Sequence, residues 1–258
     1  MVIVTNRLIY QHLGSPLLTE AFNILQEDIE IQNYLRMANI MAVKRFGYND
    51  HGPVHAKIIA GSALKIFSLL TTRIEPSSVV NGVCNYDDAR VIVLFGAYLH
   101  DLGNAIHRVD HERNSVILAM NPLDRLLNRL YNDYPELAYR VKCEILHVLF
   151  SSDNNVPCLS VEAGAVTIAD GTDMARGRSR VPYLLGKYDI HSISAQAIKR
   201  VEIEKGKEKP VLIQVTMDNP AGIFQIEEVI GRKIRSSGIS DLVEVIATMN
   251  GQKIKTGY

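Results

Sequence analysis

The stretch "VIVLFGAYLHDLGN", residues 91–104, places nine mostly apolar residues directly before a histidine and an aspartate. A run of this kind is typical of a helix that lies buried in a core. A charged side chain at the end of a buried helix is costly unless it has a partner. We therefore expect His100 and Asp101 to be satisfied by a salt bridge, a hydrogen-bond network or a metal ion.

The residues flanking this run suit the ends of helices. Asp87 and Asp88 favour the N-terminus of the buried helix, and Gly103 favours its C-terminal cap. Asp110 is a candidate cap for the next helix, which we expect from residue 111 to about residue 120.

Further segments repeat apolar residues at three- and four-residue spacing, which indicates helices packed against a core. Pro53 suits the first position of one of them, because the N–H that proline lacks has no partner there. We expect these helices over residues 16–46 in one or two pieces, from 53 to about 72, and over 123–131, 135–150 and 158–175. No clear strand interrupts them, so the first two-thirds of the chain is predicted to be all-α.

The pattern changes near residue 190. Residues 211–217 alternate between apolar and polar side chains, as a strand does, and residues 198–204 and 242–248 also resemble strands. Isoleucines at helical spacing mark an amphipathic helix over residues 223–234. The predicted fold is therefore mainly α, with a small C-terminal α+β unit of ββαβ order.

We expect two domains from this division. The first is a helical domain over residues 1–190, and the second is a small α+β domain over residues 191–258. The second domain would mediate dimerisation or regulation, and a homo-oligomer is expected.

The composition excludes several classes of function. Lys plus Arg and Asp plus Glu both number 28, so no net charge directs the chain to nucleic acid or to an anionic membrane. The three cysteines show no CxxC spacing and indicate reduced thiols. No secretory signal is present, and no run approaches the ~20 apolar residues of a membrane helix. We expect a cytoplasmic protein that acts on a small molecule.

Histidines and aspartates recur at helix ends or on otherwise apolar helix faces. His55, for example, shares a helix face with Ile59 and Ile66. Imidazole and carboxylate groups together suit divalent metals such as Zn, Fe, Mn, Co or Ni. The residues concerned, in chain order, are His51, His55, His100, Asp101, His107, His111, His147, Asp170 and Asp173.

This ordered series resembles the HD superfamily of metal-dependent phosphohydrolases, whose fold is a helical bundle. The segment "HAKIIAGSALKI" is similar to the first helix of that family, and "HDLGN" is similar to its His-Asp dyad. The segments "HERNSVILA", "EILHVLF" and "TIADGTD" resemble the later motifs. The resemblance covers residues 47–178.

The resemblance implies a ligand set for two divalent ions drawn from Mn, Fe, Co, Ni, Mg and Zn. His55, His100, Asp101 and Asp170 would hold the first ion. Asp101 would bridge to a second ion held by His111 and His147. Asp173 is the alternative to Asp170 as a ligand, and it would otherwise support the site or contact the substrate.

The resemblance also implies a hydrolytic mechanism, in which a hydroxide bridging the ions attacks a phosphate ester. His51 would protonate the leaving group, with His107 as the alternative. Arginine side chains suit phosphate oxygens, and the candidates are Arg108, Arg113, Arg176, Arg178 and Arg180.

Phosphate-ester hydrolysis, with a nucleotide or a related small molecule as substrate, is the predicted function. Two alternatives remain. The same ligand set resembles di-iron oxygenases of the HD-type fold, which need iron and O2. The third possibility is a ligand-sensing protein in which the metal is structural.

Overall fold

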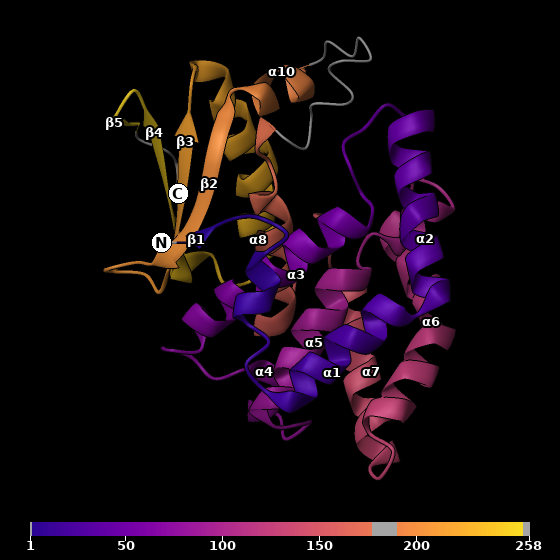
Figure 1. The fold of residues 1–258 in the computed structure, drawn as a ribbon. Helices are drawn as coiled ribbons and strands as arrows, with labels where there is room; N and C mark the ends of the chain where they lie inside the picture. The colour runs from indigo at the N-terminus through magenta and orange to yellow at the C-terminus, as the bar shows by residue number, and fades with distance from the viewer. Residues whose placement is uncertain (1, 177–189, 255–258) are drawn as a thin grey trace.

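The computed structural model describes residues 2–176 and 190–254, and within them it is mainly helical with a C-terminal five-stranded mixed sheet. Figure 1 shows the sheet at one side of the molecule and most of the helices at the other. The predicted fold class is therefore confirmed. The division into two domains stays a prediction.

The longer helices follow the predicted segments, whereas the short helices Ser77–Val80 and Ile190–Gln196 were not predicted. Short 3-10 or π-type turns extend or join several of them, at Leu8–Gln11, Ile40–Arg45, Leu102–Ala105, Pro220–Gly222, Gln225–Ile230 and Ser240–Leu242. The α-helices are α1 Pro16–Glu27, α2 Ile29–Asn39, α3 Pro53–Leu70, α4 Ser77–Val80, α5 Tyr86–Leu99, α6 His111–Leu130, α7 Pro135–Phe150, α8 Val161–Thr172, α10 Ile190–Gln196 and α11 Gly231–Ser236.

Local hydrogen bonds explain where several helices begin. Asn85 and Asp88 form a reciprocal capping box at the start of α5. The Ser160 hydroxyl accepts the Ala163 amide at 3.1 Å and starts α8. Pro53 occupies the first turn of α3, as the sequence predicts.

Helix α5 lies at the centre of the helical part. Its residues from Val91 to Leu99 are all buried, and α5 packs against α1, α3, α7 and α8. The predicted buried helix is thus present, and it delivers His100 and Asp101 to the interior.

Two predicted helix boundaries are wrong. Gly103 does not cap α5, because His100 takes that position and Gly103 lies in a 3-10 turn. A Cβ at Gly103 would lie 1.9 Å from the His111 carbonyl oxygen, so the residue allows a close approach to α6. The segments 111–120 and 123–131 form one helix, α6, which continues through Pro122. A proline removes one hydrogen bond but does not always end a helix.

The sheet has the order β1-β2-β3-β4-β5. Strands β2 (Ile198–Lys205) and β3 (Val211–Met217) are antiparallel, whereas β3 pairs in parallel with β4 (Val243–Met249) through the crossover that contains α11. This is the predicted ββαβ unit.

Two short edge strands were not expected from the sequence. Strand β1 (Val2–Ile3) joins β2 from the N-terminal end, and β5 (Gln252–Ile254) joins β4 from the C-terminal end. Backbone pairing with a neighbour orders these strands, and two or three residues carry no periodicity that a sequence can display.

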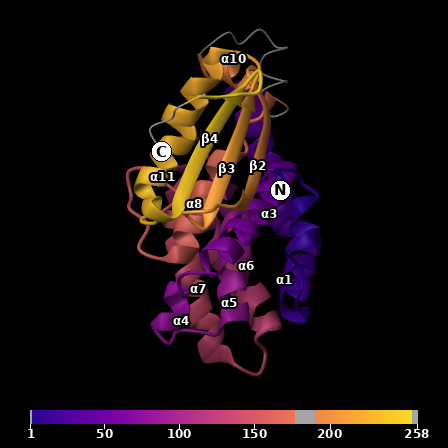
Figure 2. The ribbon, with the colours of Figure 1, turned by 90° about the vertical axis from the view of Figure 1, so that its left-hand side faces the viewer.

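Helices α8 and α11 contact each other and connect the two parts of the fold. Figure 2 shows the strands from the face opposite to these helices. Helix α3 is long and apolar enough to span a membrane by length and composition alone, but 67% of that segment is buried inside the protein.

Candidate metal centre

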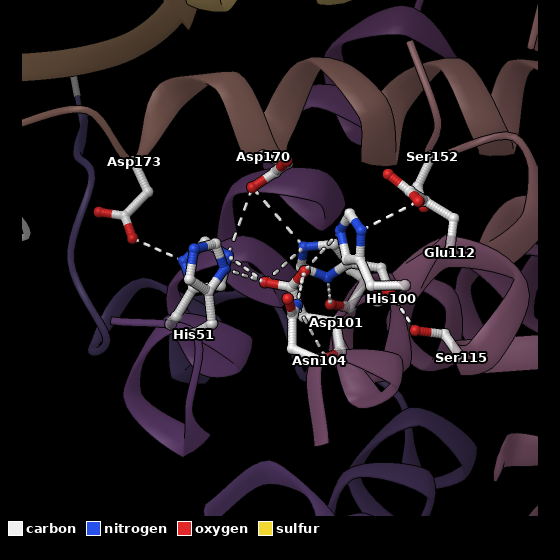
Figure 3. A network of polar contacts seen from close by, with 12 residues as sticks. His51, His100, Asp101, Asn104, Glu112, Ser115, Ser152, Asp170 and Asp173 are labelled. Atoms are coloured by element: carbon white, nitrogen blue, oxygen red, sulfur yellow. Dashed lines mark hydrogen bonds and ion pairs between the residues drawn. The ribbon is translucent and has the colours of Figure 1, made fainter. Parts of the chain in front are cut away.

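Three helix ends bring the predicted imidazoles and carboxylates together. His55 lies in the first turn of α3, and His100 caps the end of α5 with Asp101 directly after it. Asp170 lies in the last turn of α8, and Asp173 follows as its C-terminal cap. In Figure 3, Asp170 and Asp173 approach from α8, whereas His51, His100 and Asp101 approach from the opposite side.

Hydrogen bonds orient the rings of two histidines in the same way. Nδ1 of His55 lies 2.7 Å from Oδ2 of Asp173, and Nδ1 of His100 lies 2.9 Å from the carbonyl oxygen of Ala97. With the proton on Nδ1 in each ring, both Nε2 atoms present lone pairs to the interior. Metal-binding histidines are oriented by bonds of this kind.

The two Nε2 atoms face the same pair of carboxylates. Nε2 of His55 lies 3.3 Å from both Asp101 Oδ2 and Asp170 Oδ1, and Nε2 of His100 lies 3.4 Å and 3.6 Å from these atoms. Ligands at ~2.1 Å from one ion are about 3.0–3.4 Å apart when adjacent. The four separations between these nitrogens and oxygens therefore fit neighbouring ligands of a metal ion.

His100 gives a second indication that a cation belongs here. Its Nε2 atom is buried and has no hydrogen-bond partner among the described residues. A lone pair directed at carboxylate oxygens is unfavourable unless a proton or a metal ion lies between them. Two overlapping groups, His51–His55–Asp101 and His55–His100–Asp170, could hold metal ions.

Asp101 presents its second oxygen to the other side of the site. Oδ1 accepts a hydrogen bond from Asn104 Nδ2 at 2.9 Å and lies 3.4 Å from Nε2 of His111. Burial alone would raise the pKa of Asp101, but the charges that His100 and His51 carry when protonated, together with the bond with His111, hold this pKa well below its ordinary value. Asp101 is therefore ionised and able to bind a cation.

A lysine of the C-terminal unit keeps Asp170 in its ionised form. Burial opposes its charge, but Lys233 of α11, with Nζ 2.7 Å from Asp170 Oδ2, holds the pKa of Asp170 well below its ordinary value with the help of His100 and His55. One carboxylate oxygen thus faces the histidines and the other faces the lysine.

His111 is part of a second, smaller network. Its Nδ1 lies 2.9 Å from Glu112 Oε2, and its Nε2 lies 3.0 Å from Nη1 of Arg108. Burial lowers the pKa of His111, but hydrogen bonds with Asp101 and Glu112 outweigh this effect and raise it. His111 and Arg108 therefore lie against the side of Asp101 that faces away from His55.

Comparison with known proteins identifies a relative of this chain, and the name of that relative states no activity. The chain is 46% identical over 233 residues to uncharacterized protein MJ1020 of Methanocaldococcus jannaschii. These aligned residues cover 90% of this chain and 89% of the relative. The chain belongs to the MJ1020 family. No family model matches it, and no solved structure gives a significant match.

In this member of the MJ1020 family, one predicted metal ligand contacts the backbone. Nε2 of His147 lies 3.3 Å from the backbone N–H of Leu159, and burial lowers the pKa of the ring. His147 belongs to neither group that could hold an ion, although His111 reaches Asp101. The pairing of His111 and His147 around one ion stays a prediction.

The predicted phosphate-binding residues lie in different places. Arg108 Nη1 is 3.9 Å from Asp101 Oδ1, whereas Asp173 is bonded to His55. The Arg113 guanidinium lies over the ring of Phe150, and Arg176 pairs with Asp218. Arg178 and Arg180 lie outside the described residues.

Sequence reasoning missed three residues that contact this centre. Asn104 follows the His-Asp pair by three positions and could have been noticed in the "HDLGN" segment. Glu112 is adjacent to His111 and pairs with it. Lys233 is 63 positions from Asp170, and only the packing of α11 on α8 brings it to the site.

Proposed function

We propose that this chain is a metal-dependent phosphohydrolase of the HD type, which cleaves a phosphomonoester or phosphodiester of a small molecule. One observation carries the proposal: Nε2 of His55 and of His100 face carboxylate oxygens of Asp101 and Asp170 at 3.3–3.6 Å. These four residues would hold a divalent ion. The ion, when bound, polarises the phosphate and lowers the pKa of a water ligand.

The chain's own residues supply the remaining parts of the reaction. Asp173 and the Ala97 carbonyl fix the rings of His55 and His100, which keeps the ligand atoms in place. Arg108, beside Asp101, carries a guanidinium that suits phosphate oxygens. We assign to His51, with Nδ1 2.6 Å from Asp101 Oδ2, the donation of a proton to the leaving oxygen.

A second ion between Asp101, His111 and His147 is part of the sequence-based prediction. It would require Arg108 to leave its position 3.0 Å from Nε2 of His111, and His147 to release the Leu159 amide. Metal analysis of the loaded protein counts the ions directly.

The test is phosphate release in the presence of Mn²⁺, Mg²⁺, Co²⁺ or Ni²⁺ from p-nitrophenyl phosphate and from a panel of phosphate esters that includes nucleotides. The wild type is compared with Asp101→Ala and with Asp133→Ala, which removes an exposed carboxylate after α6. We expect release that requires a metal, is lost in Asp101→Ala and persists in Asp133→Ala. Metal-loaded protein that releases no phosphate from any ester contradicts the proposal and favours the oxygenase or the sensing protein.

A cytoplasmic location, a homo-oligomeric state and the absence of nucleic-acid and membrane partners are proposals from the sequence.

A further inference from the structure

A cavity of about 800 Å³ lies next to the candidate metal centre. Residues at the start of α6, in the loop after α7 and on helix α11 surround it. Both the helical part of the chain and the C-terminal unit therefore contribute walls.

Two residues that line the cavity also contact Asp101 of the metal centre. Arg108 and His111 line the cavity, and they also approach Oδ1 of Asp101 at 3.9 Å and 3.4 Å. A phosphate bound at the centre would therefore have the cavity beside it, where the rest of the substrate can lie.

The described lining is almost entirely polar. It carries three guanidinium groups and three carboxylates, besides His111, the amides of Asn154 and Asn155 and the hydroxyl of Ser236. Pro157 is its one apolar residue among those described, and the described lining includes no aromatic side chain. The guanidinium groups belong to Arg108, Arg232 and Arg235, and the carboxylates to Asp110, Glu112 and Asp153.

Such a lining fits some ligands better than others. Equal numbers of guanidinium and carboxylate groups do not favour a highly charged polyphosphate. A nucleobase offers a large flat face, which pockets ordinarily cover with apolar or aromatic side chains. Hydroxyl groups both donate and accept hydrogen bonds, so they match carboxylates, amides and guanidinium groups together.

We propose that this cavity binds the non-reacting part of a phosphorylated polyhydroxy compound, such as a sugar phosphate or a polyol phosphate. The inference rests on the proposed phosphohydrolase function and narrows its substrate class. Helix α11 thereby belongs to the substrate site: Lys233 neutralises Asp170 on one face, and Arg232 and Arg235 meet the substrate on the other.

Asp110 supports the assignment of this wall to a binding role. It is one of two non-glycine residues in the described chain with a positive φ, at 56°, and its side chain makes no capping bond to α6. A residue kept in such a backbone conformation is found preferentially at ligand sites. Here it places a carboxylate at the cavity.

The test compares glucose 6-phosphate, AMP and p-nitrophenyl phosphate as substrates of the Mn²⁺-loaded protein. We expect kcat/KM for glucose 6-phosphate to exceed that for AMP roughly tenfold or more, as charge-assisted hydrogen bonds allow. The double variant Arg232→Ala/Arg235→Ala should lower kcat/KM for glucose 6-phosphate by about tenfold more than for p-nitrophenyl phosphate. Arg140→Ala, on the exposed side of α7, is the matched control and should change neither value.

A higher kcat/KM for AMP than for glucose 6-phosphate would overturn the proposed substrate class. An equal loss of kcat/KM for glucose 6-phosphate and p-nitrophenyl phosphate in the double variant would do the same. Either result would leave the phosphohydrolase function intact. If p-nitrophenyl phosphate is not hydrolysed, the proposed function fails instead. Calorimetric titration with glucose 6-phosphate then tests separately whether the cavity binds such a compound. Binding that is weakened roughly tenfold in the double variant supports this role of the cavity. The absence of binding by the wild type overturns it.

Discussion

Oδ2 of Asp173 lies 2.7 Å from Nδ1 of His55, at the junction of α8 and α3. This bond sets the tautomer of His55 and turns its Nε2 toward Asp101 and Asp170. We propose that Asp173 acts on the metal centre through His55 and is not a ligand of the same ion.

Replacing Asp173 by alanine should weaken metal binding by about 10–100-fold, because the ring of His55 loses its orientation and some of its basicity. Calorimetric titration of the metal-free protein with Mn²⁺ measures the change. Asp133→Ala, which removes an exposed carboxylate, is the control and should bind Mn²⁺ like the wild type. Unchanged affinity in Asp173→Ala would show that the bond to His55 does not support the centre.

Lys233→Gln should destabilise the metal-free protein, because Asp170 loses the cation at 2.7 Å while it remains largely buried. Breaking a fully buried pair costs about 3–5 kcal/mol, and the partial exposure of both side chains reduces this to about 1–3 kcal/mol. Urea unfolding gives the free energy with EDTA and again with Mn²⁺. The loss of unfolding free energy in Lys233→Gln should be smaller with Mn²⁺, since the bound ion replaces the positive charge of Lys233. An equal loss under both conditions would contradict the electrostatic role.

Gly103→Ala should lower the free energy of unfolding by more than about 2 kcal/mol. The new Cβ would lie 1.9 Å from the His111 carbonyl oxygen and 2.5 Å from the Ser115 amide nitrogen, so the backbone of α6 has to move. Gly14→Ala is the matched control, because its Cβ meets no atom within 4 Å. Thermal or urea unfolding of both variants checks the difference, and equal stabilities would show that α6 yields at no cost.

His12 should make stability depend on pH. Burial, helped by the charges of Lys65 and Arg90, lowers the pKa of its ring from 6.5 to about 4. The unfolded chain takes up a proton near pH 6.5, so this stabilisation is complete above that pH and is lost as the pH falls toward 4. We expect a loss of about 1–2 kcal/mol after allowance for partial exposure.

His12→Gln isolates this contribution, because it removes the titrating group and leaves the other acidic transitions in place. As the pH falls from 7.5 to 4, the unfolding free energy of the wild type should fall by about 1–2 kcal/mol more than that of the variant. Parallel curves over this range would assign the acid sensitivity to other groups.

Residues near one another in sequence made much of the fold predictable. The apolar run before His100 predicts the central helix, and the alternation in residues 211–217 predicts a central strand of the sheet. Strands β1 and β5 were missed, because two or three residues cannot display a period and depend on a partner strand. The segments 111–120 and 123–131 were predicted as separate helices, whereas they form the single helix α6, which continues through Pro122.

The candidate centre was predictable where its residues lie at helix ends, as with His55, His100 and Asp170. Lys233 was not predictable, because its approach to Asp170 depends on how α11 packs on α8. His147 is the converse of Lys233. A sequence motif predicts it as a metal ligand, whereas in the structure its Nε2 faces the Leu159 amide.

The most direct test of the central claim is calorimetric titration of the metal-free protein with Mn²⁺, comparing the wild type with His100→Gln and Asp170→Asn. His107→Gln is the matched control, because His107 is exposed and belongs to neither group that could hold an ion. We predict tight binding by the wild type and His107→Gln, and a loss of at least about 100-fold in the other two, as expected when a ligand is removed. Binding that survives in both His100→Gln and Asp170→Asn would contradict the assignment of this site.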